Sequence, residues 1–380
     1  MKSFRKYIFA AILFASTACP FTQALTLNLN TEQKEKISEG LTDFANEVMV
    51  AAPEAATQMN VWQEAHIGNL YPSIHPHFGG GLSLGGTAIN MKGFKAAAEK
   101  IGQDFNSFNS FWNYFGGENH EDVSFGSIPD KFFLPTASLD LRIGGFVLPF
   151  DFGIFVIMTN PNIFALHLDD PSSIYNMSQA IKFSFLGFDG SIDYFSIGGD
   201  FRIRLFEENG FIPMVSVGAG YAYTKGIVKV HTDQDVEYSG KTANTSMDLG
   251  FGYQTQVIFI QGQVSKDLSL LHLFAGVRGI LSNTTSDWNW AIDTRSADYP
   301  SISISDSDSG CVTSTGLSEL HQDGKWDFSG IQPQIFAGCG FNLTKVQLTL
   351  SLCADVRSLF DKGNYTDFIW SGALGIHFKI

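Results

Sequence analysis

The sequence predicts a transmembrane β-barrel that is antiparallel and up-and-down, with about ten strands and a short N-terminal helical segment. Three observations favour this fold class. Apolar and polar residues alternate with a period of two from residue 77 onward, and the predicted turns alternate between very short and very long. The 380 residues include 35 Phe and 38 Gly but only 16% charged residues. A soluble protein carries about 25% charged residues, although a soluble all-β protein remains the alternative.

Residues 1–24 are predicted to be a secretory signal peptide. Three basic residues lie within the first six, an apolar run follows from Tyr7 to Phe14, and Thr22-Gln23-Ala24 offers small residues for cleavage. This layout is too short for a spanning helix and directs the mature chain out of the cytoplasm. An alternative treats Ser16-Thr17-Ala18-Cys19 as a lipoprotein signal, with Cys19 lipidated after cleavage.

The mature chain is acidic. Residues 1–24 contain basic but no acidic residues, so cleavage makes the chain more negative than the formal net charge of −14. An acidic surface argues against nucleic acid as a partner, because phosphates need basic side chains. Three cysteines remain after cleavage (Cys311, Cys339 and Cys353). So few cysteines, in an odd number, do not indicate a disulfide framework.

Residues 25–76 form the predicted N-terminal helical segment. Apolar residues recur at helical spacing between residues 31 and 52, and Pro53 is expected to end that helix before a shorter one that reaches about Trp62. The apolar stripe must be buried somewhere. It consists of Ile37, Leu41, Phe44 and Val48. The helix could pack inside or across the periplasmic mouth of the barrel as a plug, or bind a periplasmic partner. We expect it to cap the mouth, with Trp62 and residues 68–76 tying it to the first strand, because a lumen lined with charges leaves little room for full insertion.

Residues 77–380 are predicted to form the barrel. Ten strands are expected near 77–91, 132–146, 150–160, 181–205, 211–228, 242–264, 269–283, 327–342, 345–357 and 366–380. Twelve is the second choice, because Gly187 to Gly190 could split one strand. We interpret Phe188-Asp189-Gly190 as a bulge instead, which keeps all long loops on one side. A symmetric turn at Asn342–Lys345 would place Ala337 opposite Leu350.

Long loops are expected at the cell surface and short turns in the periplasm, as in outer-membrane barrels. The two largest expected surface loops are residues 92–136 and 285–326. The second is acidic and contains Trp288, Trp290 and Trp326, so it is a candidate surface for a ligand or cation.

The polar face of the strands should line the lumen. Leu139, Phe201, Leu249 and Leu350 are expected to face lipid, and their neighbours the lumen. The charged residues expected in the lumen are Asp140, Arg142, Asp200, Arg202, Arg204, Asp248, Arg278, Asp355 and Arg357. Two interpretations stay open for them: a ladder of salt bridges that fills a narrow barrel, or a constriction that selects solutes by charge.

No motif supports an enzyme, a cofactor or a metal site. Gly81-Leu82-Ser83-Leu84-Gly85 matches the nucleophile-elbow pattern, but that motif needs a helix directly after the strand. The stretch from Asp306 to Gly310 resembles the opening of a calcium loop, but its Gly comes one residue early. We therefore predict that the protein is not an enzyme and binds no cofactor.

The last strand, Asp367 to Ile380, carries a recognisable pattern. Gly375-x-x-Phe378-x-Ile380 resembles the C-terminal signal by which the barrel-assembly machinery receives outer-membrane proteins, although Ala373 and the final Ile depart from it. With the Phe-rich strands and the helical segment, residues 77–380 resemble spirochaetal outer-membrane barrels of unassigned function. The resemblance implies an outer-membrane location, with membrane lipid and the assembly machinery as partners. A channel or transport protein for small solutes is the leading expectation, and a surface-exposed binding or adhesion protein is the alternative.

Overall fold

The computed structural model describes residues 31–57, 62–67, 76–90, 131–145, 149–159, 180–185, 188–238, 241–296, 303–322, 325–327, 330–343, 345–360 and 369–379. The predicted signal peptide, Cys19 and most of the expected loop 92–136 lie outside the described residues. Residues 131–136 of that expected loop belong to a strand. Among the described residues, no helix is both long and apolar enough to cross a membrane.

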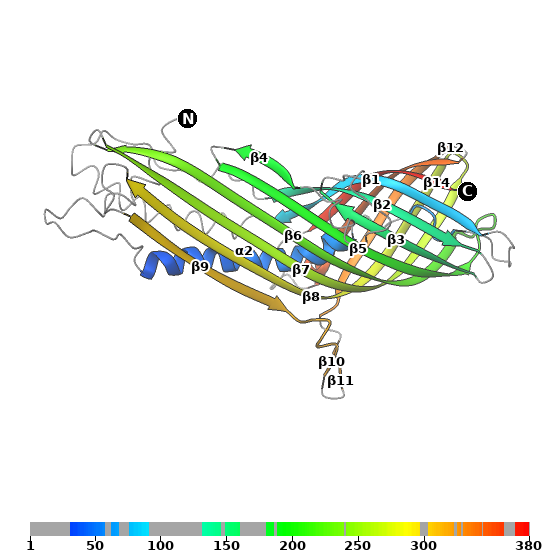
Figure 1. Cartoon of the computed structure of the whole chain (residues 1–380). Coiled ribbons are helices and arrows are strands. Elements are labelled where there is room, and N and C mark those ends of the chain that lie inside the picture. Colours follow the sequence, from blue (N-terminus) through cyan, green and yellow to red (C-terminus); the bar gives the residue numbers. More distant parts are fainter. Residues whose placement is uncertain are drawn as a thin grey trace.

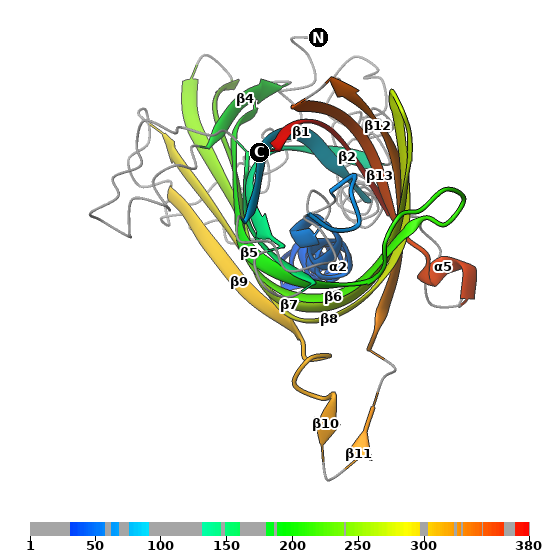
Figure 2. The ribbon, with the colours of Figure 1, turned by 90° about the vertical axis from the view of Figure 1, so that its right-hand side faces the viewer.

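Ten antiparallel strands close into a barrel, as predicted (Figures 1 and 2). They are β1 (His77–Asn90), β2 (Lys131–Gly144), β3 (Phe150–Met158), β5 (Phe188–Phe206), β6 (Met214–Tyr238), β7 (Lys241–Leu268), β8 (Leu271–Ser296), β12 (Gln332–Leu343), β13 (Val346–Asp355) and β14 (Trp370–Lys379). Neighbours in this order pair with each other, and β14 pairs with β1 to close the seam. We call the end with the β2–β3, β5–β6, β7–β8 and β12–β13 turns the short-turn end, and the opposite end the extended end.

Two further strands lengthen the sheet without adding to the ring. Strand β4 (Ile181–Phe185) pairs with β5 beyond the end of β3, and β9 (Ser303–Ser314) pairs with β8 beyond the end of β12. The predicted bulge at residues 188–190 is therefore wrong, because Phe185 pairs with Phe188 in a tight hairpin. The count of ten ring strands is unaffected. Strand β4 pairs with β5 on the same edge and in the same direction as β3, so it does not add a strand to the ring.

The expected loop 285–326 is mostly regular structure. Its first part belongs to β8, its middle is β9, and its end carries the small hairpin of β10 (His321–Gln322) and β11 (Lys325–Trp326). Trp288 and Trp290 are buried inside, so only Trp326 of the three expected surface tryptophans is exposed. The β12–β13 hairpin is also tighter than expected: Leu343 pairs with Val346 and Ala337 with Leu352, two residues from the predicted register.

An apolar belt surrounds the ring. Along β13 the outward residues at positions 346, 348, 350 and 352 are all Val or Leu, and Leu350 is 44% exposed while its neighbour Thr349 is 4% exposed. Large apolar side chains are likewise exposed on the outer face of each of the other ring strands, and a strand needs only about ten residues to cross a bilayer at a tilt. Soluble monomers rarely expose a continuous apolar surface of this size. The belt is therefore built to face lipid.

Strands β5 to β8 continue past the belt, and there the apolar side chains face inward and the polar side chains face outward. In β7, Ile258 and Ile260 face outward, but Phe251 and Tyr253 face inward and are buried. Leu249 packs against the internal core, so its neighbour Asp248 lies on the outer surface. The expected orientation of Leu249 and Asp248 is reversed, because the wall beyond lipid needs an apolar inner face and a wet outer face. We call this part of β5–β9 the extension.

Helix α2 (Thr31–Thr57) lies inside the barrel along the β6–β9 wall (Figure 2). Its first turns contact β9 at the extended end, and its last turn lies among the lumen side chains of the ring. Pro53 does not end the helix, which continues one more turn to Thr57 among small buried alanines. The expectation that the helix caps the periplasmic mouth is wrong, because its apolar stripe packs on the inward aromatic side chains of the extension. The core cluster includes Leu41, Ala45, Val48, Tyr194, Phe251, Tyr253, Phe259, Trp288 and Trp290.

Candidate functional site: the filled lumen

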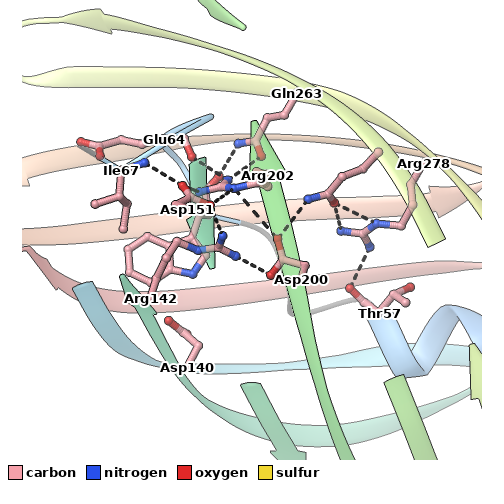
Figure 3. A network of polar contacts seen from close by, with 12 residues as sticks. Thr57, Glu64, Ile67, Asp140, Arg142, Asp151, Asp200, Arg202, Gln263 and Arg278 are labelled. Carbon is pink, nitrogen blue, oxygen red and sulfur yellow. Dashed lines mark hydrogen bonds and ion pairs between the residues drawn. The ribbon is translucent and has the colours of Figure 1, made fainter. Parts of the chain in front are cut away.

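Two arginines and two aspartates form a cluster of ion pairs in the lumen near the short-turn end (Figure 3). Arg142 of β2 donates from Nη1 to Asp151 of β3 and from Nη2 to Asp200 of β5, both at 2.6 Å. Arg202 of β5 forms two bonds to Asp151, at 2.9 and 2.7 Å. All four residues are at most 3% exposed. Their charges balance, which buried ions require.

A second polar group continues this network toward the end of α2. Arg278 of β8 donates to Gln261 Oε1 at 2.9 Å and to the carbonyl oxygen of Thr57 at 2.9 Å. Glu54 of α2 accepts hydrogen bonds from Gln334 of β12 and from Ser371 of β14. The helix end is thus tied to β8, β12 and β14.

Residues 62–67, which we call the plug, occupy the lumen near the short-turn end. The amide of Ile67 donates to Asp151 Oδ2 at 2.8 Å, and that of Ala65 donates to Ser265 Oγ at 3.0 Å. Lys379 forms an ion pair with Glu64 at 2.7 Å. Five of the six plug residues are buried. Polar contacts therefore hold the plug against β3, β7 and β14.

Glycines in the wall make room for the plug. A Cβ atom at Gly79 would lie 2.7 Å from the ring of Trp62, and one at Gly340 would collide with Gln63 Oε1. The Trp62 ring also lies beside the guanidinium of Arg142, 5.7 Å from its centroid, and 4.8 Å from the ring of His377. The Gly-rich inner face of β1 is thus a seat for an aromatic side chain.

His377 and Asp140 form another buried pair next to this seat. His377 Nε2 lies 3.3 Å from Asp140 Oδ2, and both side chains are at most 5% exposed. The two residues flank Gly81 on neighbouring strands, where any Cβ atom would collide with the imidazole. The contact therefore depends on glycine between the two partners.

Burial shifts the pKa values of two groups in the lumen segments that precede β1. Desolvation raises the pKa of the Glu54 carboxyl to about 7, and nearby Asp355 adds to the rise. Desolvation lowers the pKa of His66 in the plug to about 4, with Arg202 and Arg204 acting in the same direction. Near neutral pH, His66 is therefore uncharged, and Glu54 is partly protonated.

A cavity of about 370 Å³ borders α2 toward the extended end. It is lined by Glu35, Ser38, Glu39, Thr42 and Asp43. The three carboxylates repeat every four residues and so share one helix face, opposite the apolar stripe. Any solute in this space meets an acidic surface.

The structure places seven of the nine residues expected in the lumen inside the barrel, each at most 6% exposed. They are Asp140, Arg142, Asp200, Arg202, Arg204, Arg278 and Asp355. Asp248 is the exception on the outer surface, where it pairs with His231 at 2.7 Å. Arg357 lies in the short helix α5 (Arg357–Phe360), pairs with Asp355 and donates to the carbonyl oxygen of Val50.

Sequence reasoning missed Asp151, Glu54 and His377 of the site, whereas Trp62 was expected to tie the helical segment to the first strand, and its ring lies against Gly79 of β1. The sequence did carry a local signal for Asp151. It lies between Phe150 and Phe152, so alternation places its side chain on the face opposite the two Phe rings, together with Gly153. Glu54 belongs to the segment that was expected to cap the periplasmic mouth. The described residues contain no group of three or more His, Cys, Asp or Glu side chains that could hold a metal ion.

No family model and no curated protein matches the sequence. Among solved structures, the translocator domain of autotransporter NalP from Neisseria meningitidis is 8% identical over 90% of this chain and 99% of that one, with a TM-score of 0.33. The outer membrane protease OmpT from Escherichia coli is 7% identical, over 80% and 97%, with a TM-score of 0.36. A Pseudomonas aeruginosa FadL homologue is 9% identical, over 85% and 97%, with a TM-score of 0.24. The spirochaetal resemblance stays a prediction.

Proposed function

We propose that the protein is an outer-membrane β-barrel whose filled lumen supports a surface-exposed binding platform. The observation that carries this proposal is the continuous core between α2 and the wall of the extension. Tyr194 is 1% exposed and donates to the carbonyl oxygen of Ala55 at 2.8 Å, and the rings of Phe44 and Phe251 lie 4.9 Å apart. A helix held this way is a structural core and not a movable gate.

The apolar belt, with short turns at one end and long strands at the other, supports an outer-membrane location. Lipid covers the belt, and short turns face the periplasm in outer-membrane barrels. The extended end then projects outside the cell, with β6, β7 and β8 at 25, 28 and 26 residues. About ten residues per strand are needed to cross the membrane. More than half of each strand therefore stands beyond lipid, which gives the extension a large outer surface.

A gated channel for small solutes is the second candidate. The observation in its favour is that the plug is held by hydrogen bonds and ion pairs, not by the apolar core. The plug could leave the short-turn end while α2 stays in place. The acidic cavity beside α2 would then prefer cations.

Conductance of the purified protein in planar bilayers separates the two candidates. A platform with a filled lumen should show no stepwise conductance at either polarity. A variant in which residues 62–67 are replaced by Gly and Ser should stay closed if α2 and the ion-pair cluster alone block the path. Steady conductance of the unaltered protein would contradict the platform proposal. Conductance that appears only in the plug variant would favour the gated channel.

The binding role needs its own measurement. The labelled protein in detergent can be applied to an array of extracellular proteins and glycans, beside a variant whose extension is cut back to short turns after the belt. Binding that requires the extension supports the platform. Equal binding by both proteins would show that the belt or the detergent is responsible.

A further inference from the structure

Strand β9 has one paired edge and one edge that faces no described strand (Figure 1). It pairs with β8 from Arg295↔Ser303 to Thr284↔Ser314. Strand β12 takes over as the partner of β8 only from Ile280 downward. Over the twelve residues of β9, the part of the chain that the structure describes leaves a row of main-chain N–H and C=O groups available. Such an edge is a template for another strand.

The edge strand is held in place from the inside. Lys34 of α2 forms an ion pair with Asp306 at 2.7 Å, and Ser38 donates to Asp308 at 2.5 Å. Val312 packs against the core of the extension. The strand is thus fixed before any partner arrives, which lowers the ordering cost of binding.

Part of the usual protection of a free edge is missing: β9 has charged residues toward α2, Asp306 and Asp308, but none on its outer face. The sequence of β9, SISDSDSGCVTS, contains neither Pro nor Lys, the residues that commonly block edge pairing. Its outward side chains are small and exposed: Ser305, Ser307, Ser309, Cys311 and Thr313. A neighbouring strand could therefore approach without steric obstruction.

We propose that β9 is a strand-addition site for an extended, basic segment of a partner protein outside the cell. The proposal rests on the proposed function and names the class of partner for the platform. Main-chain pairing supplies affinity in this mode of recognition, and side chains supply selectivity. Asp308, whose side chain is exposed, favours a lysine or arginine on the incoming strand, whereas Asp306 is already paired with Lys34 of α2.

A second copy of the chain fits this edge less well. Antiparallel pairing of two β9 strands about Ser307 would place Asp306 of one copy directly opposite Asp308 of the other. Like charges directly opposite each other destabilise a sheet. The charge pattern therefore favours a basic partner over self-association.

Cys311 provides a native reporter for the test. It is exposed on β9, whereas Cys339 is half-buried and Cys353 is buried. The probe is a synthetic dodecapeptide of alternating Lys and Val with one central Cys, activated as a mixed disulfide with thionitrobenzoate. Attack by the Cys311 thiolate joins peptide to protein and releases thionitrobenzoate, and cross-strand neighbours lie at a distance that a disulfide can span.

The expected result is rapid labelling of Cys311 in the detergent-solubilised full chain. A peptide with the same side chains but N-methylated amides should label at least about tenfold more slowly, the effect of losing one or more hydrogen bonds. The variant Asp308→Asn should slow labelling severalfold. Cys311→Ser should abolish it, which identifies the site.

Three outcomes would overturn the proposal. Equal labelling by the methylated peptide would mean attraction by charge alone, and no labelling would mean that the edge is already covered. A disulfide-linked dimer through Cys311 would mean that a second copy takes the edge. The proposed function is checked separately by a membrane-impermeant maleimide on intact cells: if Cys311 reacts there, the extension is outside the cell even when strand addition fails.

Discussion

Arg202 and Asp151 face each other on neighbouring strands and share two hydrogen bonds, with Nε 2.9 Å from Oδ1 and Nη2 2.7 Å from Oδ2. The same carboxylate accepts from Arg142 at 2.6 Å and from the amide of Ile67 at 2.8 Å. One side chain of β3 therefore connects two neighbouring strands to the plug.

Replacing Asp151 should be costly for this reason. In Asp151→Asn, two buried guanidinium groups lose their shared counter-charge, and breaking a buried pair costs about 3–5 kcal/mol. Urea unfolding in lipid vesicles measures the loss. Asp248→Asn is the matched control, because it removes a carboxylate from the exposed pair with His231, and exposed pairs contribute at most about 1 kcal/mol. Similar losses in the two variants would show that the buried cluster is not a structural centre.

Glu54 predicts a specific dependence of stability on pH. Its folded pKa of about 7 lies above the ordinary value of 4.5, so the fold favours the protonated form. This contribution is full below about pH 4.5 and is lost as the pH rises through about 7, a change of about 3 kcal/mol. Glu54→Gln should remove it, so the variant gains on the unaltered protein between pH 5 and pH 8.

The control for this prediction is His66, whose lowered pKa acts in the opposite direction. Its neutral form is favoured, so its contribution is lost as the pH falls from about 6.5 to about 4. His66→Asn should flatten the acid side of the profile and leave the change near neutral pH. Parallel profiles for the unaltered protein and Glu54→Gln would contradict the assignment to Glu54.

The reversal of β7 at the end of the belt can be tested residue by residue. Leu350→Arg places a charge in lipid and should cost about 2–4 kcal/mol near the bilayer midplane. Gln256→Arg lies outward beyond Ile258 and should be tolerated. Phe251→Asp should destabilise the extension, because Phe251 faces the helix core. Refolding yields into vesicles give the ranking. Tolerance of Phe251→Asp with loss in Gln256→Arg would show that the extension is not inside out.

Gly79 should control the seat of the plug. A larger side chain there must displace the Trp62 ring, which lies 2.7 Å from the position of a Cβ atom. In Gly79→Leu, a cysteine introduced at Ala65, where the native side chain is fully buried, should become reactive toward maleimide. Gly80→Leu is the matched control, because a Cβ atom at residue 80 would meet Leu141 and Phe378 and not the Trp62 ring. An equally slow reaction in both variants would mean that the plug does not depend on this seat.

Local alternation predicted the ring well because each belt strand obeys one rule. Leu348, Leu350 and Leu352 face lipid, and the polar residues between them face the lumen. The same alternation misled in β7, because apolar side chains face lipid in the belt but face helix α2 in the extension. The change has a local signal: Val257 to Ile260 are four consecutive apolar residues, so both faces are apolar where the belt and the internal core overlap.

The site was predictable only in part. Charged residues in the strands identify an inward polar face, since the alternative is a charge in lipid. Which charges meet depends on the register between strands far apart in the sequence, as for Arg142 and Asp200. The burial of α2 was not predictable, because an amphipathic stripe does not specify what covers it. Only the completed wall of Phe251, Tyr253 and Trp290 shows where the stripe fits.

The direction of α2 constrains how the protein is assembled. The helix begins at the extended end, the chain then descends through the plug, and β1 starts at the short-turn end. Closing the β1–β14 seam first would force a 27-residue helix to thread through an interior already packed with side chains. The helix must therefore travel to the far side while the seam is still open, and the wall must wrap around it. Because α2 precedes every barrel strand in the chain and becomes enclosed when the seam closes, a delay in its insertion would leave a half-closed barrel with an exposed seam.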